Sequence, residues 1–219
     1  WGEAAAGGDS NEVREQLKDV QQIQVTHNAF CALRQDTTVI CWGDGDSGGR
    51  LPPQRLEGVE RIQGSFSAFA AILADGHVVT WGDPTAGGDS SRVQNQLHNV
   101  RDIQATWYAF AAIRQDGTAV TWGASFSGGD SAQVQGQLVD VHEIQATHNA
   151  FAAIVGPERR VVSWGAANAG GDCSRVQHEL QHIQQIQAAH FAFAAIRRDG
   201  HIIPWGNPVF GGHVDGESG

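Results

Sequence analysis

The sequence predicts an all-β repeat protein, a β-propeller or an arc of propeller blades, built of five units of roughly 41 residues. The first observation behind this prediction is a Trp-Gly dipeptide that returns at nearly constant spacing. It stands at 1–2, 42–43, 81–82, 122–123, 164–165 and 205–206, with intervals of 41, 39, 41, 42 and 41 residues. A period of roughly 20 to 50 residues is typical of propellers and solenoids, so the repeat decides the fold class.

Two further dipeptides keep the same period. Each Trp-Gly is followed by Gly-Gly, at 7–8, 48–49, 87–88, 128–129, 170–171 and 211–212, and Ala-Phe stands at 29–30, 68–69, 109–110, 150–151 and 192–193. We therefore interpret residues 1–219 as one repeat domain, with units at about 1–41, 42–80, 81–121, 122–163 and 164–204 and a partial unit at 205–219.

Each unit contains three short segments with strand character, as the third unit illustrates. The segments are 101–106, 109–115 and 118–123, and Asp116-Gly117 joins the last two as a strong hairpin signal, because glycine accepts the positive φ of tight turns. The same Asp-Gly stands at 75–76 and 199–200. The first unit has Asp36-Thr37 and the fourth has 156–159, so we expect these two hairpins to turn differently.

The stretch after each Gly-Gly is ambiguous. Val93, Leu97 and Val100 have the spacing of one helix face, whereas the Leu51-Pro52-Pro53 run of the second unit suits an extended segment. We expect a short fourth strand or a single helical turn. The Asp that follows most Gly-Gly pairs, at 9, 89, 130 and 172, lacks the full set of calcium ligands around it, and we interpret it as a cap of the next turn.

A unit of this size cannot bury both faces of its own sheet, so the units must stack on one another. We expect side chains at alternating positions to pack between blades, and the Trp of Trp-Gly to close the last strand of each unit. In the third unit the expected inter-blade residues are Ile103, Ala109, Ala111, Ile113 and Val120.

Composition excludes several function classes. The chain has 24 acidic and 14 basic residues, and its formal charge of −10 argues against nucleic-acid binding and against anionic membranes. No apolar run approaches the roughly 18 residues of a membrane span, so we expect a soluble or peripheral protein. Since the chain lacks Met, a leader could have been removed, and localisation stays unknown. No catalytic, cofactor-binding or paired-Cys metal motif is present, so we expect no enzyme activity, no cofactor and no metal.

The three cysteines leave at least one thiol unpaired within the chain. A two-residue turn at Asp36-Thr37 would place Cys41 opposite Ala32, with Cys31 on the other face of the sheet. We therefore predict that Cys31 and Cys41 are buried free thiols, whereas a three-residue turn would reverse that prediction.

The string V..I.....AFAAI..DG..VTWG....GG, complete at 59–88 and 100–129, resembles the repeat of RCC1-like propellers. Its short period is most similar to the compact form found in the bacterial β-lactamase-inhibitor propeller. The histidine of the family's second strand is Ala here, at 29, 68, 109, 150 and 192. Family members usually have seven blades, so both a closed five-bladed ring, completed by residues 1–8, and an open arc are compatible with the five units.

A variable pair of residues follows the first predicted strand of each unit, in what we term the b–c turn. The pairs are His27-Asn28, Phe66-Ser67, Trp107-Tyr108, His148-Asn149 and His190-Phe191. All these turns emerge on one face of a propeller, and exposed aromatic residues there favour protein binding. The resemblance implies the same, because matching loops of the compact family member carry its partner-binding aromatics. We predict that a protein partner binds His27, Phe66, Trp107, Tyr108, His148, His190 and Phe191.

The three histidines of this set raise the alternative of a metal site. We expect His27, His148 and His190 to lie too far apart on an arc for a zinc ion, whose ligands must sit about 2.0–2.1 Å from it. The predicted function is a non-enzymatic protein-binding scaffold, an accessory subunit of a larger assembly. The distribution of the family suggests a membrane or photosynthetic supercomplex in an alga. Alternatives are a multivalent lectin, a small-GTPase regulator by family analogy, and structural filler in a longer array.

Overall fold

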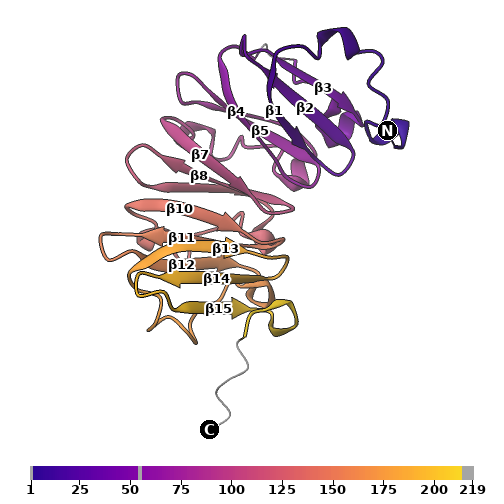
Figure 1. Ribbon diagram of the computed structural model, residues 1–219. Helices are drawn as coiled ribbons and strands as arrows, with labels where there is room; N and C mark the ends of the chain where they lie inside the picture. The colour runs from indigo at the N-terminus through magenta and orange to yellow at the C-terminus, as the bar shows by residue number, and fades with distance from the viewer. Residues whose placement is uncertain (1, 54–55, 214–219) are drawn as a thin grey trace.

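The computed structural model describes residues 2–53 and 56–213, which form five three-stranded antiparallel sheets, as the repeat predicts. We number the sheets as blades 1 to 5 in chain order (Figure 1). Their strands are β1 Val20–Val25, β2 Ala29–Arg34 and β3 Val39–Gly43; β4 Val59–Gly64, β5 Ala68–Leu73 and β6 Val78–Gly82; β7 Val100–Ala105, β8 Ala109–Arg114 and β9 Ala119–Gly123; β10 Val141–Ala146, β11 Ala150–Val155 and β12 Arg160–Gly165; β13 Ile183–Ala188, β14 Ala192–Arg197 and β15 Ile202–Gly206.

Short helical turns occupy the segments between blades, and no fourth strand joins a sheet in the described part of the chain. Of the two expectations for the outer segment, the helical turn is therefore confirmed. The turns are η1 Ala4–Ala6, η2 Arg14–Gln16, η3 Gly45–Gly49, η4 Pro84–Ala86, η5 Gln94–Gln96, η6 Ser125–Ser127, η7 Gln135–Gln137, η8 Ala167–Ala169 and η9 Pro208–Phe210. None of these helices is long and apolar enough to cross a membrane.

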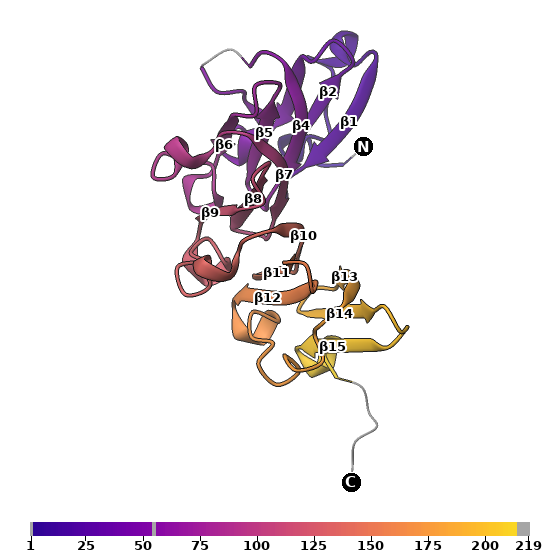
Figure 2. The same ribbon diagram turned by 90° about the vertical axis from the view of Figure 1, so that its left-hand side faces the viewer.

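The blades follow one another along an open arc, with blade 1 and blade 5 at its two ends (Figures 1 and 2). The first strands of consecutive blades lie side by side, so β1, β4, β7, β10 and β13 line the inner side of the arc. Residues 2–8 do not complete the last sheet. They pack against blade 1 instead, where the Trp42 Nε1–H donates a hydrogen bond to the Gly7 carbonyl. Of the two alternatives for five units, the structure adopts the arc.

The hydrophobic core is divided into separate clusters, each lying between two consecutive blades. Ile103 and Val120 pack on blade 2, and Ala109, Ala111 and Ile113 pack on blade 4, so all five expected inter-blade residues are confirmed. Small alanines on the second strand of each blade let neighbouring sheets approach closely. The repeat is therefore stable only as a stack.

The three repeated dipeptides meet in one joint between each blade and the next. The Trp122 Nε1–H donates to the carbonyl of Gly87 in the preceding Gly-Gly loop at 3.0 Å, and its ring stacks on Phe110. Gly87 has a φ of 92°, and a Cβ there would lie 2.5 Å from the Phe110 ring. Trp81, Trp164 and Trp205 make the same bond to Gly48, Gly128 and Gly170. Trp-Gly, Gly-Gly and Ala-Phe are thus parts of a single packing unit.

The hairpin of blade 1 turns like the Asp-Gly hairpins, contrary to our expectation. In blade 3 the Arg114 N–H donates to the Thr118 carbonyl across a three-residue loop, and Gly117 has a φ of 78°. Blade 1 has the same bond from Arg34 to Thr38, with Thr37 at a φ of 67°. The hairpin at 156–159 does differ, as expected, because β11 pairs Val155 directly with Arg160 of β12.

This three-residue turn overturns our prediction for the cysteines. It pairs Cys31 directly with Cys41, so both side chains project from the same face of the sheet, and they form a disulfide. Cys173 is a buried free thiol, and burial raises its pKa. The disulfide links β2 and β3 within blade 1, so it does not connect one blade to another.

The aspartates after Gly-Gly cap the next turn, as we expected. One carboxylate oxygen of Asp89 accepts a hydrogen bond from the Ser91 N–H at 2.9 Å, and Asp9, Asp130 and Asp172 make the equivalent contact. These hydrogen bonds lower the pKa of Asp89 and Asp172. The carboxylates therefore have a structural role in the repeat.

Candidate protein-binding face

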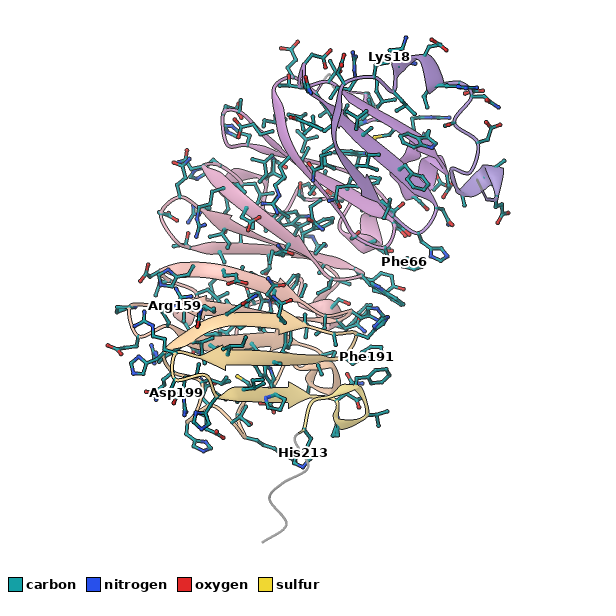
Figure 3. All side chains as sticks on the ribbon, viewed as in Figure 1. Lys18, Phe66, Arg159, Phe191, Asp199 and His213 are labelled. Carbon is teal, nitrogen blue, oxygen red and sulfur yellow. A yellow bond between two sulfur atoms is a disulfide. The ribbon has the colours of Figure 1, made fainter. Side chains whose placement is uncertain are left out.

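The structure brings the predicted binding residues together along one edge of the blades. His27 lies in the β1–β2 turn, Phe66 in β4–β5, Trp107 in β7–β8, His148 in β10–β11 and His190 in β13–β14. We call these five residues the turn row. Figure 3 shows Phe66 and Phe191 on the same edge of the molecule, whereas Arg159 and Asp199 lie on the opposite edge.

Backbone hydrogen bonds link the turn row from blade to blade. The His27 N–H donates to the Phe66 carbonyl at 2.7 Å, and the same bond runs from Phe66 to Trp107, from Trp107 to His148 and from His148 to His190, each at 2.9 Å. One backbone amide per blade therefore fixes the spacing of the turns. Side chains on this row are held in place before any partner arrives, which reduces the entropy lost on binding.

A hydroxyl at the preceding position ties each of the first four turns to its own blade. The Thr106 Oγ1–H lies 3.0 Å from the Ser127 carbonyl in the following Gly-Gly loop, and Thr26, Ser65 and Thr147 make the equivalent contact. Ser65, Thr106 and Thr147 are buried. The turn row thus stands on a buried layer of satisfied polar groups.

The rings of the turn row contact one another in chain order: His27–Phe66 and Trp107–His148 are stacked, Phe66–Trp107 is tilted, and His148–His190 is edge-to-face. Ring centroids are separated by 4.7 Å for His27–Phe66, 5.2 Å for Phe66–Trp107, 3.8 Å for Trp107–His148 and 4.3 Å for His148–His190. Our expectation that the three histidines lie far apart is wrong for His148 and His190, which are in contact because neighbouring turns bond directly. His27 is three blades away from His148.

His148 is the most enclosed histidine of the row. Burial, together with the neighbouring His190, lowers the pKa of His148, so its ring is favoured in the neutral form. Its Nδ1 is buried and has no hydrogen-bond partner among the described residues. A neutral ring stacked on Trp107 behaves as one more aromatic contact of the row.

A second tier of aromatic rings flanks the row, and sequence reasoning found only half of it. Tyr108 and Phe191, which we predicted, contact Phe126 of η6 and Phe210 of η9 at centroid distances of 5.6 and 4.9 Å. Phe126 is 62% exposed and Trp107 is 40% exposed. Phe126 and Phe210 could have been found from the sequence, because only two of the six Gly-Gly loops, 123–129 and 206–212, contain an aromatic residue.

A shallow depression of about 530 Å³ runs along the turns of all five blades. Its walls are the turn-row residues, and small residues at the ends of the first strands form its floor: Gly64, Ala105, Ala146 and Ala188. The depression is long and open, so it suits an extended surface of a partner better than a small enclosed ligand.

Comparisons with known proteins show the fold. No family model matches the chain, and no curated protein matches it. Among solved structures, Prp20p of Saccharomyces cerevisiae has a TM-score of 0.62 at 16% identity, and the match covers 90% of this chain and 59% of Prp20p. The ectodomain of the Arabidopsis thaliana receptor kinase ACR4 has a TM-score of 0.58 at 17% identity, covering 86% and 69%. Human WBSCR16 has a TM-score of 0.55 at 16% identity, covering 85% and 61%.

These structures place the chain in the class of RCC1-like repeat propellers by fold, as the resemblance predicted. A complex of Kap60 with Prp20, the yeast RCC1, matches with a TM-score of 0.60 at 15% identity. Against the Prp20 structures, this chain spans less than three fifths of their length. Prp20 itself binds Gsp1p, histones and Kap60.

Proposed function

We propose that the protein is a non-catalytic scaffold that binds a protein partner through the turn row and its flanking rings. The observation that carries this proposal is the continuous run of ring-to-ring contacts along one edge, with Trp107 and Phe126 substantially exposed. Trp and Tyr are the residues that most often dominate protein–protein binding energy. The backbone ladder beneath them supplies the preorganisation that such a surface needs.

The distribution of ring types favours one asymmetric partner over a repeated small ligand. A multivalent lectin would present an equivalent aromatic residue in each blade, but the turns hold His27, Phe66, Trp107, His148 and His190. In the part of the chain that the structure describes, the flanking rings occur only beside blades 3 and 5. A single protein surface contacts such a set more naturally than identical sugars do.

Within this proposal, the protein acts as an accessory subunit of a larger assembly. Protein binding by Prp20, which has the same fold, makes this role reasonable, and a membrane or photosynthetic supercomplex is the setting we favour. Regulation of a small GTPase rests on analogy with the family alone, since no residue of the turn row is matched to a residue that performs this function in the family.

Capture from an extract of the native source tests the proposal. We expect wild-type protein to retain a defined partner and the double variant Trp107→Ala/Tyr108→Ala to lose it, with a fall in affinity of about thirtyfold or more, as for a binding hot spot. Val139→Ala is the matched control, because Val139 is 53% exposed but precedes β10 at the opposite edge. Equal capture by the double variant and the wild type would contradict the proposal, and saturable binding on a glycan array would favour the lectin.

A further inference from the structure

Charge is distributed unequally between the two edges of the blades. The turn edge consists of the b–c turns, at 26–28, 65–67, 106–108, 147–149 and 189–191, and of the Gly-Gly loops, at 2–8, 43–49, 82–88, 123–129, 165–171 and 206–212. Backbone hydrogen bonds hold turns and loops together, for example from the Asp44 N–H to the Asn28 carbonyl and from the Asp83 N–H to the Ser67 carbonyl.

The turn edge is acidic and contains no lysine or arginine. Its charged residues are Glu3, Asp44, Asp46 and Asp83. The residue directly after the Gly-Gly loop adds an Asp in four units, at 9, 89, 130 and 172, against a single Arg50. All other lysines and arginines lie outside these segments. The negative charge of the edge is therefore concentrated in the loops at 2–8, 43–49 and 82–88, whereas the three later Gly-Gly loops have no charged residue.

The hairpin edge on the opposite side has both signs of charge, and its charges pair locally. Arg34 contacts Asp36 at 3.2 Å, Arg114 contacts Asp116 at 3.4 Å and Arg197 contacts Asp199 at 2.7 Å. Figure 3 shows Arg159 and Asp199 together on that side. Cations of the hairpin edge therefore compensate its carboxylates.

The carboxylates of the turn edge have no such compensation. Among the described residues, neither Asp44 nor Asp83 forms an ion pair, and both accept hydrogen bonds from their own loops. The bond from the Ser47 hydroxyl lowers the pKa of Asp44, which keeps that carboxylate ionised. Asp46 is exposed, and together with Asp83 it lines the depression between blades 1 and 2. These charges are open to a cation from outside.

The exposed rings beside these charges favour the same kind of ligand. A lysine or arginine side chain is attracted to the face of an aromatic ring within about 6 Å. Carboxylates near the ring attract the same cation by their charge. Phe66 is partly buried and directly precedes Ser67, whose carbonyl accepts a hydrogen bond from the Asp83 N–H, and Trp107 lies in the next turn. Neutral His148 adds no opposing charge.

We propose that the partner segment bound at the turn edge is rich in lysine and arginine. This inference rests on the proposed function and specifies the chemistry of the partner: cationic side chains approach the loops of blades 1 and 2, and its apolar side chains contact the rings of blades 2, 3 and 5. Negative charge on one edge also accelerates the encounter with a cationic segment and makes its affinity fall with added salt.

Two triple variants with equal change in net charge test the proposal. Asp44→Asn/Asp46→Asn/Asp83→Asn neutralises three carboxylates of the turn edge. Asn keeps the single capping oxygen of Asp83 and the Asp44 oxygen that accepts from Ser47, and it loses the second Asp44 oxygen, which accepts from the Asp46 N–H. Asp36→Asn/Asp75→Asn/Asp116→Asn neutralises three hairpin-edge carboxylates in the same way. The probe is a synthetic peptide of alternating Lys and Leu, compared with peptides that have Gln or Glu in place of Lys, by fluorescence anisotropy at low and high salt.

We expect the Lys-Leu peptide to bind wild-type protein more tightly than the Gln and Glu peptides, and the turn-edge triple variant to weaken its binding about tenfold. The hairpin-edge triple variant should change it less than twofold. Equal weakening by both triples would overturn the proposal, because it would show a response to net charge alone. A native partner lost by Trp107→Ala/Tyr108→Ala but retained by the turn-edge triple would also overturn it, while leaving the proposed function standing.

Discussion

Thr37 has the backbone conformation that glycine has in three other hairpins. Its φ is 67°, and Gly76, Gly117 and Gly200 occupy the same place at 77°, 78° and 88°. A β-branched residue in the left-handed region costs roughly 1–2 kcal/mol, because its Cβ crowds the backbone. No side-chain hydrogen bond of Thr37 offsets this cost among the described residues.

We therefore predict that Thr37→Gly stabilises the protein by about 0.5–1 kcal/mol, since the relief of strain exceeds the larger unfolded-state entropy of glycine. Urea denaturation with the disulfide intact measures the change in the free energy of unfolding. Thr38→Gly is the control and should destabilise, because the Thr38 hydroxyl bonds the Asp36 carboxylate at 2.6 Å. A Thr37→Gly protein less stable than wild type would contradict the account of this turn.

The same residue explains why the disulfide could not be predicted. Sequence reasoning treated Asp36-Thr37 as unlike Asp-Gly because threonine rarely accepts a positive φ. Its tertiary setting overrides that preference, and the resulting three-residue turn puts Cys31 opposite Cys41. Phe126 was missed for a different reason: four of the six Gly-Gly loops have no aromatic residue, and Phe210 stands one position later in its loop than Phe126 does, so the repeat does not single out the position.

The joint between blades is the element that the repeat encodes best. Each internal joint combines a buried Trp, the carbonyl of a Gly-Gly loop and a Phe ring, and all three dipeptides are visible in the sequence. The outer segment could not be assigned, because Val93, Leu97 and Val100 suit a helix although only Gln94–Gln96 is helical. Leu97 and Val100 are buried between blades, so packing rather than helix periodicity explains their spacing.

At this scale we predict that Trp122→Phe costs about 1–3 kcal/mol, because the buried Gly87 carbonyl loses its hydrogen-bond donor. Thermal and urea unfolding measure the loss. Trp42→Phe is the matched control: Trp42 makes the same bond to Gly7 at the end of the arc, but its ring is only partly buried, whereas the Trp122 ring is buried between two blades, so we expect a smaller cost. Equal costs for the two variants would show that burial between blades does not strengthen this joint.

At the scale of the whole molecule, the repeat places the variable pairs of the b–c turns next to one another on one continuous edge of the arc. Period and turn position predict that the variable pairs share one face, and the structure places all of them on one edge. Their contacts could not be predicted, because ring-to-ring distances depend on how far each blade rotates relative to the last. The arc also leaves Ile23 and Ile202 at its two ends 55% and 63% exposed, whereas the corresponding residues between blades, such as Ile62 and Val78, are buried.

Hydroxyl-radical footprinting of the protein with and without its captured partner tests the central claim most directly, since aromatic side chains report their own exposure. We predict that partner binding lowers the oxidation of Trp107, Tyr108 and Phe126 severalfold, while exposed Val139 at the opposite edge and Ile202 at the end of the arc stay unchanged. Unchanged oxidation of the three aromatic residues, with protection of Val139 or Ile202 instead, would contradict the assignment of the turn edge as the binding face.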